Sequence, residues 1–86
     1  MYLSLKKTKN TPAILQEFDK REINAVITEY KDSVDIDIHK DEMERNGYLA
    51  FASITYQYVK IHKTYPYDAK DEITIPFEEI LVIYNI

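Results

Sequence analysis

The most constraining feature of the sequence is a strict alternation of apolar and polar residues in one short stretch. Three β-branched residues alternate there with three polar ones, in the order Val34, Asp35, Ile36, Asp37, Ile38 and His39. Successive side chains of a β-strand point to opposite faces of a sheet, so the pattern predicts a strand that is buried on one side only. We expect the three apolar side chains to be buried and Asp35 and Asp37 to be exposed. A register shift of one residue would exchange the two faces.

The N-terminal part of the chain predicts one short helix. Thr11 and Pro12 suit a helix start, and Ile14, Leu15 and Phe18 fall on one face at helical spacing. The helix is expected near residues 12–20 and must pack on a sheet, because a helix this short is not stable alone. The preceding residues, 2–6, predict a short edge strand, with nearby lysines keeping that edge soluble.

Short alternating segments separated by turn residues predict several more strands. Besides the strand at 34–38, they are expected at residues 22–30, at 48–65 (two strands, or one strand bent near 54–57), at 72–75 and at 80–84. Residues 41–46 are expected to form a polar connection that ends at the turn dipeptide Asn46-Gly47. A turn is expected at residues 66–71 and a single helical turn at residues 76–79.

One helix, followed by five or six short strands that are joined mainly by short turns, leaves no room for the long crossovers of a parallel sheet. With only 86 residues, the chain is expected to form one small β-rich domain over residues 1–86. We predict a mostly β (α+β) fold, in which a small antiparallel sheet curls in the manner of an SH3 or Sm barrel. One short N-terminal helix caps it.

Composition excludes several classes of function. The chain has a single glycine, Gly47, whereas phosphate-binding loops need several, so common nucleotide-binding motifs are absent. It has no cysteine, which excludes disulfides and cysteine-rich zinc sites. No apolar run approaches the ~20 residues of a membrane span, and the first residues lack the order of a signal peptide. We therefore expect a cytoplasmic protein without a membrane association and without a cofactor.

The closing segment, residues 72–83 (EITIPFEEILVI), resembles the end of the YolD-like family, small proteins of Firmicutes and their phages. In that family a strand leads into a Pro-Phe-acidic-acidic-Ile turn and then into a final strand. Residues 27–32 (ITEYKD) are similar to the first strand and turn of the same family. The resemblance implies a small non-enzymatic accessory protein that acts beside a DNA-handling partner, and it carries no catalytic motif.

Two arrangements of acidic residues could form a chemical site. Asp35, Asp37 and His39 would share one strand face at about 6.5–7 Å intervals and could contribute to a cation site if a neighbour supplied further ligands. The solvent-facing side of an amphipathic strand explains the same pattern, so we expect no bound metal. The pairs at 41–42 and 78–79 lie in expected turns, where solvent screens carboxylates, and no nucleophile has a partner base. We therefore predict that the protein is not an enzyme.

An acidic run through the strand and loop is the leading candidate for a functional surface. It consists of Glu29, Asp32, Asp35, Asp37, Asp41, Glu42 and Glu44. Spaced carboxylates can imitate phosphates and steer a protein onto a basic groove. The prediction is a protein-interaction module, an accessory or inhibitory factor of phage or mobile-element type that binds a larger protein, such as a DNA-handling enzyme. An ordinary solvated face would have the same composition.

The alternative is a small barrel that binds single-stranded nucleic acid. Tyr56, Tyr58, Lys60 and His62 would share one strand face if Val59 and Ile61 point inward, as expected for rings that stack on bases beside cations that meet phosphates. Tyrosines are also good cross-strand partners on a half-exposed sheet. The formal net charge of −4 argues against a nucleic-acid footprint.

Overall fold

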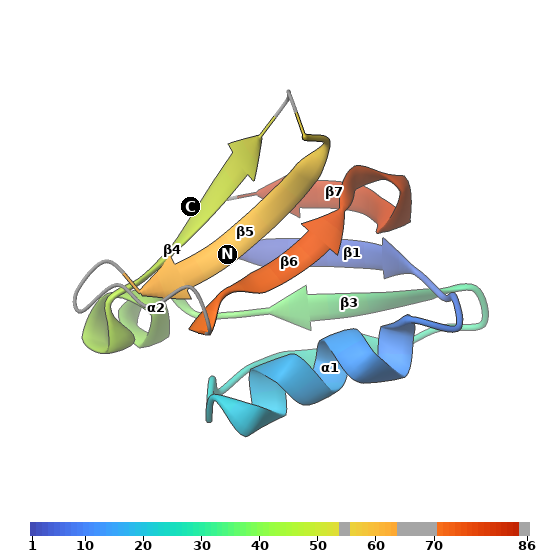
Figure 1. Ribbon diagram of the computed structural model, residues 1–86. Helices are drawn as coiled ribbons and strands as arrows, with labels where there is room; N and C mark the ends of the chain where they lie inside the picture. Colours follow the sequence, from blue (N-terminus) through green and yellow to red (C-terminus); the bar gives the residue numbers. More distant parts are fainter. Residues whose placement is uncertain (54–55, 64–70, 85–86) are drawn as a thin grey trace.

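The computed structural model describes residues 1–53, 56–63 and 71–84, which form two antiparallel sheets and short helices (Figure 1). One sheet has the strand order β2-β3-β1-β7, with bounds Val26–Glu29, Ser33–Asp37, Tyr2–Lys6 and Ile80–Tyr84. The other has the order β4-β5-β6, with bounds Tyr48–Ser53, Tyr58–Lys63 and Ile73–Pro76. The helices are α1 (Thr11–Lys20), α2 (Lys40–Asn46) and the 3₁₀ turn η2 (Phe77–Glu79). The mostly β antiparallel class is therefore confirmed. Within the described residues the strands pair as two separate sheets, and no pairing closes a barrel.

One hydrophobic core joins the two sheets and α1. Its fully buried members come from β1, α1, β3, β5 and β6 and from Ile38, which directly follows β3. The largest are Leu3, Leu5, Phe18, Val34, Ile36, Ile38, Val59, Ile61, Ile73 and Ile75. Helix α1 contributes Ile14 and Phe18, as its apolar face predicts, and lies beside β6 (Figure 1). The predicted helix is thus confirmed, and tertiary packing supplies the stability that its ten residues lack.

The register of β3 agrees with the sequence prediction. Val34, Ile36 and Ile38 are completely buried, and Asp37 is exposed. Asp35 is half-buried rather than fully exposed, because the Tyr2 hydroxyl donates a hydrogen bond of 2.6 Å to its Oδ2 atom. The two faces of the strand are therefore assigned correctly.

Strand β1 is not at an edge, so that prediction is wrong. It pairs with β3 on one side and with β7 on the other, and its Leu3 and Leu5 are completely buried. Of the lysines that suggested an edge, Lys6 is the last residue of the strand, and Lys7 and Lys9 follow it. The edges of the four-stranded sheet are β2 and β7.

Strand β2 is shorter than predicted, because the residues before it end the helix. The backbone N–H of Ile23 donates to the carbonyl of Phe18 at 3.1 Å, and that of Glu22 donates to Asp19 at 2.9 Å. These two hydrogen bonds form a Schellman motif, which ends a helix with one residue in the left-handed region. Here that residue is Glu22, with φ of 56°. The pairing of β2 begins only at Val26.

The predicted polar connection at residues 41–46 is also wrong, because these residues belong to α2. Its first turn carries Asp41 and Glu42 and its last turn Arg45, an order that complements the helix dipole. Gly47 ends the helix in the left-handed conformation, with φ of 68°, and donates its N–H to the carbonyl of Glu44 at 3.1 Å. With one buried apolar side chain, Met43, the segment is too short to show helical periodicity.

The later elements follow the prediction closely. The segment 48–65 contains two paired strands, β4 and β5, while residues 54–55 and most of the expected turn at 66–71 lie outside the described residues. The single helical turn is η2, and β7 follows it directly. A register shift between Ser4 and Leu5 lets β7 keep Ile80 opposite Leu5 and leaves Leu81 exposed.

Candidate protein-interaction surface

The side of the four-stranded sheet that faces away from the core forms a continuous surface, called here the outer face. Partners in an antiparallel register share a face, and the pairings align Val26, Asp37, Tyr2 and Tyr84 in one row. The next row consists of Thr28, Asp35, Ser4 and Val82. Tyr30 extends it at the β2–β3 turn, where its N–H donates to Ser33 at 2.8 Å. Val26, Tyr30, Val82 and Tyr84 on this face are exposed to solvent, so no described helix covers them.

The outer face is rich in large side chains that solvent can reach. Val26 is 70% exposed and Tyr84 is 59% exposed, and Tyr30 and Val82 are also exposed. The rings of Tyr2 and Tyr84 lie with their centroids 6.2 Å apart, at an interplanar angle of 36°. A half-exposed sheet normally places polar residues on its solvent side, so this apolar and aromatic content is unusual.

Two carboxylates lie at the centre of this aromatic surface. Asp35 accepts the hydrogen bond from Tyr2, which raises the pKa of the Tyr2 hydroxyl above its usual value. Asp37 is exposed in the next pairing, and neither acid forms an ion pair within the described part of the chain. Lys6 lies on the same strand side but at the opposite end of the pairing, across from Ser33. The centre of the outer face is therefore negative.

The structure spreads the seven acids of the predicted run over three places. Asp35 and Asp37 lie on the outer face, whereas Glu29 and Asp32 are exposed at the end of β2 and in the turn that follows. On α2, Asp41 lies 3.6 Å from His39 and Glu44 lies 3.8 Å from Lys40. The seven acids do not form one patch, although Asp37, Asp41 and Glu42 line a common pocket between the end of β3 and α2.

Glu42 does not belong to an exposed acidic surface. It is 7% exposed, its Oε1 atom accepts a hydrogen bond of 3.0 Å from the backbone N–H of Asn24, and Arg45 pairs with its other oxygen. This carboxylate fastens α2 to the segment that enters β2. Its role is structural, and helix formation explains why sequence spacing did not reveal it.

The alternative tyrosine face on β5 has the predicted alternation. Val59 and Ile61 are buried, so Tyr58, Lys60 and His62 share the other side. The ring of Tyr56 lies 6.0 Å from that of Tyr58. These contacts bring the predicted aromatic residues together at the beginning of the strand.

The cation on this face is paired. The Lys60 Nζ atom lies 3.0 Å from Glu72 Oε2 and 5.1 Å from the centre of the Tyr58 ring. The hydrogen bond to Glu72, followed by that to Tyr58, raises the pKa of Lys60. Glu72 therefore neutralises the positive charge of Lys60 that would otherwise attract a nucleic-acid phosphate.

The hypothetical Asp35, Asp37 and His39 cation site does not assemble. Strand β3 ends at Asp37, and His39 caps α2 by accepting a hydrogen bond of 3.1 Å from the N–H of Asp41 at its Nδ1 atom. Among the described residues, no group of three His, Asp or Glu side chains is arranged to hold a metal ion. In the same part of the chain, no helix has the length and apolar character needed to cross a membrane.

Sequence reasoning missed the aromatic half of the outer face. Tyr2 and Tyr84 stand at opposite ends of the chain, and only the pairing of β1 with β7 brings them together. The predicted strand at residues 22–30 ends at Tyr30, and the alternation of Tyr30 with Thr28 and Val26 is the signal that indicates a shared face. Local spacing cannot predict which strands pair to complete that face.

No family model, curated protein or solved structure matches the chain. The resemblance to the YolD-like family therefore rests on the residues quoted above and stays a prediction.

Proposed function

We propose that the protein is a non-catalytic interaction module that binds a larger protein through the outer face of the four-stranded sheet. The observation that carries this proposal is an uncovered sheet face on which exposed tyrosines and valines surround Asp35 and Asp37. Tyrosine is enriched in protein interfaces, and exposed apolar patches commonly mark interaction sites. The negative centre favours a partner that presents lysine or arginine side chains.

The finer parts of the proposal extend the sequence prediction. The partner is a DNA-handling enzyme with a basic groove, and the protein is an accessory or inhibitory factor of phage or mobile-element type in the cytoplasm. The fold belongs to the small curled sheets of SH3 or Sm type, and the succession of β6, η2 and β7 supports a relation to the YolD-like family, because the resemblance implies a strand, a turn and a final strand there.

A charge-matched comparison tests the proposal. We expect the double variant Asp35→Asn and Asp37→Asn to capture less of its partner from a Firmicutes lysate than the wild type does. Glu44→Gln with Glu78→Gln removes the same charge from two exposed positions on α2 and η2, outside the outer face, and should capture the partner normally. With the partner purified, the loss should lie mainly in the association rate and should shrink at high salt. Equal effects of the two double variants would contradict the proposal.

Single-stranded nucleic-acid binding is the second candidate function. The observation in its favour is the ring pair of Tyr56 and Tyr58 next to Lys60 and His62. Fluorescence anisotropy with short single-stranded DNA and RNA at low salt tests it, and we expect flat curves. Saturable binding at micromolar concentration or below would replace the leading proposal. Tyr56→Ala and Tyr58→Ala should then each cost about 1–3 kcal/mol per stacked base.

A further inference from the structure

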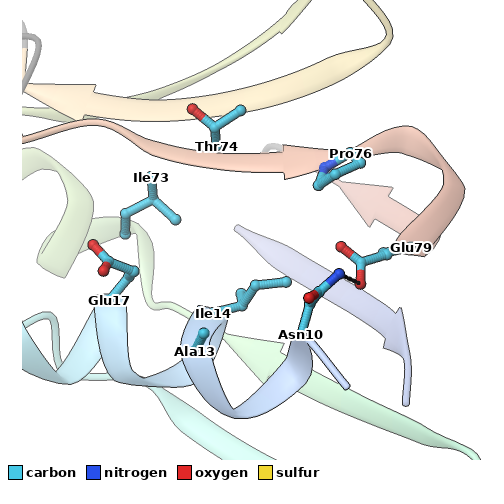
Figure 2. A pocket seen from close by; sticks show the side chains of 8 residues that line it. All are labelled: Asn10, Ala13, Ile14, Glu17, Ile73, Thr74, Pro76 and Glu79. Carbon is cyan, nitrogen blue, oxygen red and sulfur yellow. Dashed lines mark hydrogen bonds between the residues drawn. The ribbon is translucent and has the colours of Figure 1, made fainter. Parts of the chain in front are cut away.

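A pocket of about 290 Å³ lies between α1 and β6, away from the outer face (Figure 2). Its walls are mainly apolar, and acidic groups stand at its margins; the lining side chains that matter here are Ala13, Ile14, Ile73, Pro76, Glu17 and Glu79. No lysine or arginine lines it among the described residues. Ligand pockets begin at about 300 Å³, so this one suits a small ligand.

Glu79 is the chemically unusual residue of this pocket. It belongs to η2, is 4% exposed, and accepts two hydrogen bonds at the same oxygen. Oε1 lies 2.5 Å from the Thr8 hydroxyl and 3.2 Å from the Asn10 side-chain nitrogen. The other oxygen, Oε2, is buried and has no hydrogen-bond partner in the described part of the chain. Buried polar atoms almost always have a partner, so an orphaned carboxylate oxygen calls for a donor.

Figure 2 shows where a donor could come from. The dashed bond joins Asn10 to one oxygen of Glu79, and the second oxygen lies on the side of the carboxylate toward Pro76 and the pocket. Glu79 has no ion pair with a described lysine or arginine. Its charge is thus met only by two neutral donors.

Glu17, the other acid of the pocket, is already satisfied. Arg21 pairs with its carboxylate, and the hydrogen bond from that guanidinium lowers the pKa of Glu17. Arg21 in turn donates to the backbone carbonyls of Asp71 at 2.8 Å and Glu72 at 3.3 Å, which fastens α1 to the start of β6. The free acceptor of the pocket is therefore Glu79.

We propose that this pocket binds a primary ammonium group on a short alkyl chain. The ammonium donates to Oε2 of Glu79, and the alkyl carbons contact Ala13, Ile14 and Ile73. A cation on an apolar stem is the ligand that matches one buried carboxylate and apolar walls. Oε2 is shielded from water in the free protein, so binding requires a small rotation of the carboxylate about a torsion that is broad and soft. The inference does not depend on the proposed function, because it concerns another part of the molecule.

Titration with n-butylammonium chloride, followed by ¹H–¹⁵N correlation spectra, tests the proposal. We expect saturable shifts of the amide signals of Ala13, Ile14, Ile73 and Thr74. n-Butanol has the same alkyl chain without the charge, and sodium chloride supplies the salt without the chain, so neither should produce these saturable shifts. Saturation by n-butanol at the same concentration would overturn the proposal without any variant.

Two isosteric variants locate the acceptor. Glu79→Gln should weaken n-butylammonium binding by about tenfold or more, because a neutral amide replaces the charged acceptor. Glu17→Gln should change it by less than about threefold, since that carboxylate already has its own cation. An unchanged affinity in a folded Glu79→Gln variant, or no saturable shift in the wild type, would mean that Glu79 serves only to hold the loop before α1.

A further arm separates two sources of the ammonium group. Nα-acetyl-lysine methylamide presents the same butylammonium group on a peptide unit. Binding tighter than that of n-butylammonium would indicate the lysine side chain of a protein, and weaker binding would indicate a free alkylamine. Both outcomes require the same contact with Glu79.

Discussion

The outward sides of the two sheets contain similar residues but differ in how their charges are compensated. The outer face of the four-stranded sheet carries Tyr2 and Tyr84 around Asp35 and Asp37, and no ion pair neutralises these acids within the described residues. The β5 face carries Tyr58 beside Lys60, and Glu72 from just before β6 pairs with that lysine. On the outer face, the negative charges of Asp35 and Asp37 are available to a partner. On the β5 face, the ion pair between Lys60 and Glu72 leaves no such net charge.

This contrast shows that a charge in the sequence is not yet a charge on the surface. Glu42 and Asp37 both belong to the acidic run, but Glu42 is buried against Asn24 and Arg45 while Asp37 is exposed. Desolvated, hydrogen-bonded charges hold elements together, whereas exposed charges steer association. Four predictions test whether the two surfaces differ in this way.

The largest effect is expected beneath the outer face. Ile36→Ala should lower the free energy of unfolding by about 2–5 kcal/mol, because it leaves a cavity in a fully buried part of the core. Its neighbour Asp37 points to the other side, and Asp37→Ala should change the same quantity by about 0.5 kcal/mol or less. Urea denaturation measures both. A larger loss from Asp37→Ala would invert the assigned faces.

The second prediction concerns Glu42, the buried acid of the predicted acidic run. Glu42→Ala should destabilise the protein by about 1–3 kcal/mol, because the backbone N–H of Asn24 and the Arg45 side chain lose a partially desolvated acceptor. Glu44→Ala is the matched control on the same helix, where the side chain is exposed, and should cost about 0.5 kcal/mol or less. If the two variants have similar melting temperatures, Glu42 behaves like an exposed side chain and has no structural role.

The third prediction tests the compensation on the β5 face. Glu72→Gln removes the charge that pairs with Lys60, so it should strengthen any binding of single-stranded DNA, by at most about 1 kcal/mol. The gain should disappear at high salt. Fluorescence anisotropy measures it, with Glu44→Gln as a control for net charge. If both variants bind equally, the pairing of Lys60 is not what limits this face.

The smallest effect is a titration shift on the outer face. The pKa of Tyr2 is raised from 10.0, chiefly by its hydrogen bond to Asp35. Because the folded pKa is the higher one, the stabilisation from this bond is present below the ordinary tyrosine pKa and is lost as the pH rises through the folded value. Asp35→Ala should bring the Tyr2 pKa back toward 10.0, whereas Asp37→Ala should leave it nearly unchanged. ¹³C spectra of ring-labelled tyrosine between about pH 8 and 12 follow the phenol directly. If Asp35→Ala leaves the pKa of Tyr2 unchanged, the hydrogen bond between Tyr2 and Asp35 does not form in solution.

The sequence by itself determined the elements whose pattern is local. The alternation from Val34 to Ile38 identified the buried face of β3, and the apolar spacing of Ile14 and Phe18 identified α1. These inferences succeed because each side chain's direction follows from the backbone geometry of its own segment. The alternation around Val59 likewise placed Tyr58, Lys60 and His62 on one face.

Tertiary structure alone decided which distant residues meet. In the apolar run from Ile80 to Ile83, periodicity cannot say which side chains point inward, and the bulge opposite Ser4 and Leu5 settles it. The same pairing of the first strand with the last brings Tyr84 to Tyr2 and builds the outer face. Glu79 meets Thr8 across 71 positions of sequence for the same reason. Strand pairing and burial are properties of the whole chain, because each depends on the desolvation and hydrogen bonding of partners that local spacing does not specify.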